Sequence, residues 1–117
     1  MGGELQKMEE RIQSLLKKLG IEQEQKGYSY LFQAIYRIVE DFELVGSVTK
    51  LLYSDLAREY RSTPVHVERT IRYLVEKSWE QGDEATFERL FGYNRMNGQT
   101  RPTNSEYIAI LADEARR

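Results

Sequence analysis

Glu68, Arg69 and Arg72 lie within five residues of one another and combine one carboxylate with two guanidinium groups. A guanidinium can donate two hydrogen bonds to O6 and N7 of guanine, and a carboxylate can accept one from N4 of cytosine. These side chains would suit a DNA site with a core of C and G, each good contact discriminating by about 1–3 kcal/mol. The same residues also fit a plain solvated helix face, in which Glu68 and Arg72 form an ordinary i,i+4 ion pair.

Holding these three side chains on one face requires a helix, and the sequence predicts one over residues 64–79 that ends near Gly82. Thr63 is a suitable N-cap and Pro64 a suitable first helical residue. At about 100° per residue, the core-facing arc consists of Val67, Ile71, Leu74, Val75 and Ser78. The opposite arc contains Val65, Arg69, Arg72 and Glu76, with Glu68 on its flank.

A second helix and a short turn come directly before this segment. The spacing of Leu51, Leu52, Leu56 and Tyr60 predicts a helix over residues 48–60, in which Ala57 lets a neighbouring helix approach closely. Residues 61–63, Arg-Ser-Thr, then form the turn, without the glycine that such turns usually contain. Two helices joined in this way are typical of a DNA-binding helix-turn-helix, whose second helix presents its N-terminal half to the major groove.

Seven further residues of this region are candidates for contacts with the DNA backbone. Each carries a positive charge or a side chain that can donate a hydrogen bond to a phosphate. They are Lys50, Arg58, Arg61, Ser62, Thr63, His66 and Tyr73. The alternative is that they are ordinary surface residues that keep the domain in solution.

The net charge of the chain is -2, with a pI near 5.5, whereas DNA-binding domains are usually basic. The charge is unevenly distributed, however. Residues 58–77 carry five basic and three acidic side chains, a balance of +2, so the rest of the chain is acidic. The positive excess therefore lies on the predicted helix-turn-helix.

Several classes of site are excluded by composition. The chain has no cysteine and one histidine, His66, so it lacks the ligands of thiolate and multi-histidine metal sites. It has no glycine-rich phosphate loop, and its adjacent carboxylates, Glu9-Glu10 and Glu40-Asp41, point about 100° apart on a helix. We therefore expect neither an enzyme nor a cofactor or metal. No apolar run approaches the roughly 18 residues of a membrane span, and we expect a cytoplasmic protein without a membrane partner.

The apolar spacing and the turn residues predict an all-α fold, a compact bundle of about six helices that contains the helix-turn-helix. The expected helices span 4–19, 27–44, 48–60, 64–79 and 83–91, followed by a last helix that begins with a capping box at Thr103 and Glu106. Residues 93–102 form a polar loop. We expect residues 1–117 to be one helix-turn-helix effector domain, with residues 1–11 a linker or an extension of the first helix.

The sequence resembles the C-terminal effector domain of the stage-zero sporulation response regulator A family of endospore-forming bacteria. The resemblance covers about residues 12–116, and several of the similar stretches are loops, which helix packing alone would not dictate. The stretches are 26–31, 43–53, 67–72, 90–93 and 101–109.

The resemblance implies a six-helix effector domain that activates or represses genes at entry into sporulation. It implies binding to a TGTCGAA-like box, often by copies on tandem boxes, with base reading by Glu68, Arg69 and Arg72. It also places a contact surface for the primary sigma factor of RNA polymerase after the recognition helix, for which the plain alternative is helix packing and a solvated loop. The surface candidates are Glu80, Asp83, Glu84, Glu88 and Arg89.

The sequence departs from the family in two ways. We expect no phosphoacceptor receiver domain within 117 residues, so DNA binding by this chain would be constitutive. Residues 97–100 are nearly neutral where the family tends to carry lysines, which weakens the expectation of backbone contacts from this loop. The alternative function is a protein-interaction module of the same fold, which modulates a full-length relative without reading DNA.

Overall fold

The computed structural model describes residues 2–47 and 51–117. Within these ranges the chain forms six α-helices and two short 3-10 helices, and it contains no strand. The α-helices are α1 (Gly2–Lys18), α2 (Tyr28–Glu40), α3 (Tyr53–Glu59), α4 (Pro64–Gln81), α5 (Glu84–Phe91) and α6 (Asn104–Arg116). The 3-10 helices are η1 (Phe42–Ser47) and η3 (Arg95–Asn97). The predicted all-α bundle is confirmed.

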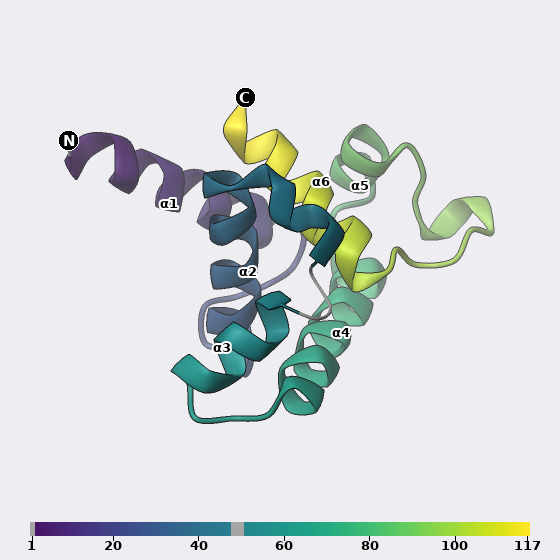
Figure 1. The fold of residues 1–117 in the computed structure, drawn as a ribbon. Helices are drawn as coiled ribbons and strands as arrows, with labels where there is room; N and C mark the ends of the chain where they lie inside the picture. The colour runs from purple at the N-terminus through teal and green to yellow at the C-terminus, as the bar shows by residue number, and fades with distance from the viewer. Residues whose placement is uncertain (1, 48–50) are drawn as a thin grey trace.

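The helices surround one apolar core. α2 packs along α6, α1 contacts both of them, and α3 packs on α4, which also touches α2 and α6. Figure 1 shows the first turns of α1 extending away from the body on one side, and the segment with η3 projecting on the other. The recognition helix predicted from the sequence is therefore held at one end of the bundle by α3, α2 and α6.

The predicted helix caps of α4 and α6 are confirmed. The Thr63 hydroxyl accepts a hydrogen bond from the His66 N–H at 3.1 Å, and Pro64 is the first residue of α4. At α6, Thr103 and Glu106 form a reciprocal capping box, with both hydrogen bonds at 3.1 Å. These caps satisfy N–H groups that have no partner within the helix.

Two predicted helices are shorter than expected. α2 ends at Glu40 rather than near Leu44, because Asp41 takes an extended conformation (φ -144°) and its carboxylate accepts from the Glu43 N–H. α3 is Tyr53–Glu59, and residues 48–50 of the predicted helix lie outside the described residues. The predicted apolar face of this segment is only partly buried: Leu52 and Leu56 are in the core, whereas Leu51 and Tyr60 are exposed.

One buried polar pair ties α4 to α6. The Tyr107 hydroxyl lies 2.7 Å from that of Ser78, and both residues are fully buried. Burial raises the pKa of Tyr107, and the hydrogen bond to Ser78 offsets part of that rise. The folded protein therefore keeps this proton at a pH where the unfolded chain has released it.

We predict a loss of folding stability above about pH 10, the ordinary pKa of tyrosine, because only the unfolded chain then gains from ionising Tyr107. Tyr107→Phe should lower the folding stability by about 1 kcal/mol at pH 8, because the hydrogen bond is lost. Above pH 10 the stability of this variant should fall less steeply than that of the wild type. Urea denaturation between pH 8 and pH 11 measures both effects. Tyr73→Phe, at a residue 58% exposed, is the control, and equal slopes for all three proteins would contradict the prediction.

Candidate DNA-binding surface

The turn between α3 and α4 has a defined backbone conformation. Arg61 takes a left-handed conformation (φ 54°), the only positive φ at a non-glycine among the described residues. The N–H of Ser62 donates to the Ala57 carbonyl at 2.7 Å, and that of Arg61 to the Arg58 carbonyl at 3.4 Å. This pair of bonds is a Schellman motif, in which glycine normally takes the left-handed position. Arg61 thus occupies the position of the turn glycine that is missing from the sequence.

We predict that Arg61→Gly raises folding stability by about 0.5–1 kcal/mol, because glycine adopts this φ without steric cost. The same change removes a cation from the turn, so it should weaken DNA binding. Arg61→Lys is the matched control, since it keeps both the charge and the backbone strain. Chemical denaturation and a DNA titration of the three proteins test the prediction, and a less stable Arg61→Gly variant would refute it.

The two predicted faces of α4 are confirmed. The five residues assigned to the core are all buried: Val67, Ile71, Leu74, Val75 and Ser78. On the opposite face Val65 and Arg69 are exposed, and the side chain of Arg72 is 47% exposed. The N-terminal half of α4 therefore presents two guanidinium groups to the solvent.

The two arginines of this face differ in their surroundings. Arg72 forms an ion pair with Glu68, with 3.5 Å between Nη1 and Oε1, so the i,i+4 pair expected for a solvated face is present. Arg69 forms no ion pair with any described residue. The structure thus brings Glu68 and Arg72 together and leaves Arg69 outside that pair.

Two contacts, one from the start of α6 and one from the loop before it, hold this face of α4 in place. The Asn104 amide donates to the Glu68 backbone carbonyl at 3.1 Å, and Arg101 pairs with Glu76 at 2.9 Å. Neither was predicted, because the partners lie 36 and 25 residues apart in the sequence. The capping box at Thr103 predicted where α6 begins, but not which helix lies against it.

The candidates for backbone contacts lie around the α3–α4 turn, except for Tyr73, which lies further along α4, and Lys50, which is outside the described residues. Arg58 is exposed and lies 3.4 Å from Asp55. Thr63 caps α4, and Ser62 beside it is half-buried.

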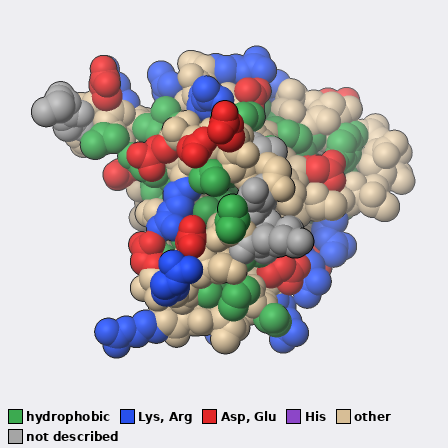
Figure 2. Space-filling view, viewed as in Figure 1, with side chains coloured by type: hydrophobic (Ala, Val, Ile, Leu, Met, Phe, Trp, Pro, Cys, Tyr) green, Lys and Arg blue, Asp and Glu red, His purple; other side chains and the backbone are tan. Residues whose placement is uncertain are grey.

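The two aromatic candidates have different neighbours. His66 is half-buried, with its ring edge-on to that of Tyr30 at 6.0 Å. Tyr73 is exposed further along α4, with the Lys77 ammonium 5.9 Å from its ring centroid. Figure 2 shows Lys and Arg side chains projecting at the lower edge of the molecule, where α3 and α4 lie in Figure 1. Elsewhere on this face acidic and basic side chains are interspersed.

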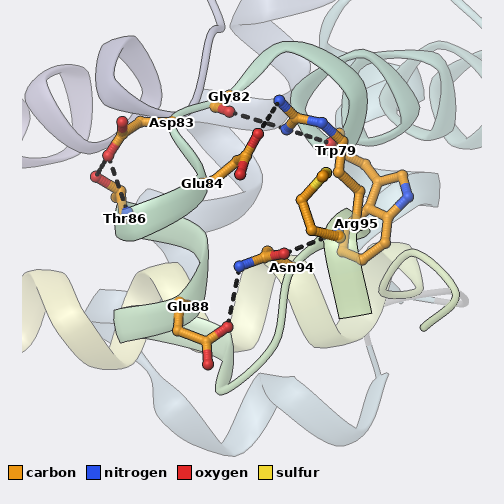
Figure 3. A network of polar contacts seen from close by, with 9 residues as sticks. Trp79, Gly82, Asp83, Glu84, Thr86, Glu88, Asn94 and Arg95 are labelled. Atoms are coloured by element: carbon orange, nitrogen blue, oxygen red, sulfur yellow. Dashed lines mark hydrogen bonds and ion pairs between the residues drawn. The ribbon is translucent and has the colours of Figure 1, made fainter. Parts of the chain in front are cut away.

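The segment after α4 contains a polar network (Figure 3). Asp83 caps α5, accepting from the N–H and hydroxyl of Thr86 at 2.9 and 2.7 Å, and these bonds lower the pKa of the carboxyl group. Glu88 accepts from the Asn94 amide at 3.1 Å, and Arg89 pairs with Glu114 at 3.2 Å. Glu80 is exposed at the end of α4.

Arg95 is a central residue of this network that was not predicted from the sequence. Its guanidinium donates to the Trp79 and Gly82 carbonyls at 3.2 and 3.1 Å and pairs with Glu84 at 2.9 Å (Figure 3). It therefore satisfies carbonyls at the C-terminus of α4 and joins them to α5. The only local signal was an arginine in a polar loop, a pattern that is common on protein surfaces and indicates no particular partner.

The described residues contain no membrane-spanning helix and no metal cluster. None of their helices is long and apolar enough to cross a membrane. Likewise, no group of three or more His, Asp or Glu side chains in residues 2–47 and 51–117 is placed to hold a metal ion.

An all-α bundle in which a four-residue turn joins two helices, the second exposing arginines on its first half, has the features of a helix-turn-helix DNA-binding domain. A comparison with protein families makes the assignment specific. Residues 12–115 match the model of the C-terminal domain of the sporulation initiation factor Spo0A, and the chain belongs to that family. The resemblance noted in the sequence is confirmed. The family is one of DNA-binding domains of a sporulation regulator and not of enzymes.

Proposed function

We propose that this domain binds DNA sequence-specifically in sporulation initiation, with α4 in the major groove of a TGTCGAA-like box. The observation that carries the proposal is the exposure of Arg69, together with the Glu68–Arg72 pair, on the N-terminal half of α4. This is the part of a recognition helix that reaches base edges. The two guanidinium groups suit guanines of the box, and the carboxylate suits the cytosine of its central CG step.

The backbone contacts come from the α3–α4 turn in this proposal. Arg58 and Arg61 supply charge, and Thr63 and His66 lie at the N-terminus of α4, where the positive end of the helix dipole favours an anion. Because the whole chain carries a charge of -2, non-specific attraction to DNA is small. Binding therefore depends on base contacts more than it does in a strongly basic domain.

A fluorescence anisotropy titration against a TGTCGAA duplex and a scrambled duplex of the same composition tests the proposal. We expect the cognate duplex to bind at least about 100-fold more tightly than the scrambled duplex. This threshold is one decade below the range of about 10³–10⁷ that is typical of specific recognition. Equal, weak binding to both duplexes would overturn base reading. Heterodimer formation with a full-length relative, without DNA binding, would instead support the protein-interaction module.

The segment after α4 is the proposed contact surface for the primary sigma factor. Its candidates are Glu80, Asp83, Glu84, Glu88 and Arg89. The network around Arg95 supports this role, because it fixes Glu84 and the start of α5 relative to α4. On tandem boxes, two copies of the domain would bind side by side and gain affinity from their neighbour contact. Glu80→Lys should reduce transcription activation in vitro while leaving box affinity unchanged.

A further inference from the structure

An exposed apolar side chain lies on the N-terminal half of α4 without a role in the function proposed above. Val65 is the second residue of α4, and 61% of it is exposed. It precedes Glu68, Arg69 and Arg72 by three, four and seven residues, so at about 100° per residue the four side chains share one face. Val65 is thus an apolar member of a face whose other three members are the proposed base-reading residues.

The stability of the fold does not explain a valine at this position. The residues of α4 that reach the core lie on the opposite face of the helix. Valine is also a weaker helix former than alanine, so the helix itself gains nothing from it. Single exposed apolar residues are common on protein surfaces. The position of Val65 among side chains proposed to contact bases is therefore the feature that points to a ligand.

Valine can make a contact with DNA that its charged neighbours cannot. In the major groove the C5-methyl group distinguishes thymine from the other bases, and apolar side chains recognise it. The branched Cβ of valine holds its two methyl groups largely in one rotamer within a helix. Because the side chain is already rigid, a contact with a thymine methyl group carries little cost in conformational entropy.

The order of the residues along α4 indicates which base Val65 would meet. With Glu68 on the cytosine of the central CG step, the arginines that follow it lie toward the guanine, which is the 3′ neighbour of that cytosine. Val65 precedes Glu68 and would lie toward the 5′ neighbour. Three helical residues span about 4.5 Å, against about 3.4 Å between successive base pairs. Because TCGA reads the same on both strands, this 5′ neighbour is a thymine whichever cytosine Glu68 contacts.

We propose that Val65 contacts the C5-methyl group of the thymine that precedes the central cytosine, and that it is a further specificity-determining residue of α4. The inference rests on the proposed function and deepens it, since it adds a T·A pair to the C and G bases assigned to Glu68, Arg69 and Arg72. The contact carries no charge and releases no counterion. It therefore contributes the same discrimination at low and at high salt.

Replacing single thymines of the box with uracil tests the proposal at the level of one methyl group. Uracil lacks the C5-methyl group and keeps the hydrogen-bonding groups of thymine. At one of the two thymines that precede the CG step, uracil should weaken wild-type binding about 4-fold, the loss expected for one buried methyl group. Val65→Ala should weaken binding to the thymine duplex and be insensitive to uracil at that position. Additive effects of variant and base at both thymines would overturn the proposal.

Two further measurements separate a methyl contact from a change in fold or charge. Val65→Ala should melt at a temperature no lower than the wild type, because the side chain is exposed and alanine is the better helix former. Its slope of log Kd against log salt should equal that of the wild type, since no phosphate contact is lost. A shallower slope would indicate a role in backbone binding and overturn the proposal.

Leu5→Ala is the matched control for the loss of an exposed apolar side chain. Leu5 is 55% exposed and lies in the first turns of α1, which extend away from the body of the domain. This variant should bind the box with wild-type affinity and keep the full sensitivity to uracil. Arg69→Ala should bind more weakly but also keep that sensitivity, because it retains Val65.

These results are separable from those that test base reading as a whole. If the wild-type domain binds cognate and scrambled duplexes equally, base reading fails and the Val65 contact fails with it. If the domain discriminates between the duplexes but uracil has no effect at either thymine, only the Val65 proposal fails. Discrimination together with a uracil effect that Val65→Ala abolishes supports both.

Discussion

Replacing Arg69 with alanine is expected to weaken binding to the cognate box by about 1–3 kcal/mol, a factor of about 5 to 150, and to relax discrimination at one guanine. The physical reason is that Arg69 is exposed on the N-terminal half of α4 and pairs with no described residue, so its guanidinium is free to bind a base. For the same reason its loss should leave the melting temperature unchanged. Anisotropy titrations with duplexes substituted at each position of the box measure the effect.

Arg72→Ala should lose at least as much affinity as Arg69→Ala. It removes a base contact and also leaves the Glu68 carboxylate without the cation 3.5 Å away, facing the negative DNA. The double variant Glu68→Ala/Arg72→Ala should therefore bind non-specific DNA more tightly than Arg72→Ala alone. Arg117→Ala controls for the loss of one positive charge elsewhere. If cognate and scrambled duplexes lose affinity equally in Arg69→Ala and Arg72→Ala, these residues contact phosphates rather than bases.

Gly27→Ala is expected to cause the largest loss of folding stability, about 2–5 kcal/mol. Gly27 has a φ of 89°, which costs alanine about 1–2 kcal/mol. A Cβ at this position would also lie 2.2 Å from Cγ2 of Thr70 on α4, and such overpacking costs typically about 1–3 kcal/mol. The Thr70 hydroxyl donates to the His66 carbonyl at 2.7 Å, which fixes the position of that methyl group.

A second substitution separates the two contributions. Gly27→Ala/Thr70→Ser lacks the clashing methyl group but keeps the hydroxyl, so it should recover the packing part of the loss and not the backbone part. Thr70→Ser alone provides the reference, and urea denaturation gives the free energies of all four proteins. A loss below about 1 kcal/mol for Gly27→Ala, or no recovery in the double variant, would contradict the prediction.

The sequence was sufficient to predict features that depend on neighbouring residues. The two faces of α4 follow from the repeat of Val67, Ile71 and Leu74, and its start follows from the Thr63-Pro64 pair, so both were predicted correctly. The end of α2 was not, because the apolar pattern continues through Phe42 and Leu44 although Asp41 breaks the helix. Those two residues pack against the core from η1 instead, which periodicity alone does not distinguish from a longer helix.

The residues that were not predicted from the sequence make contacts with partners far away along the chain. Arg95, Arg101 and Asn104 each contact α4 from loops or helix ends between 16 and 36 residues away. The family match, the caps and the exposed face of α4 identify the candidate surface. The contacts that hold this surface in place depend on how α6 packs against α4. No local sequence pattern contains that information.

The ion pairs along α4 have a consequence for how the domain finds its site in a genome. Because Arg72 is paired with Glu68 and Arg101 with Glu76, part of the positive charge beside α4 is neutralised before DNA binds. Non-specific sites outnumber a specific box by about 10⁶–10⁹, and a weakly charged surface leaves each of them quickly. If α4 reads the box as proposed, the Arg72–Glu68 pair opens there and the Arg72 guanidinium contacts a base. We therefore expect a fast search at little cost to the affinity of the final complex.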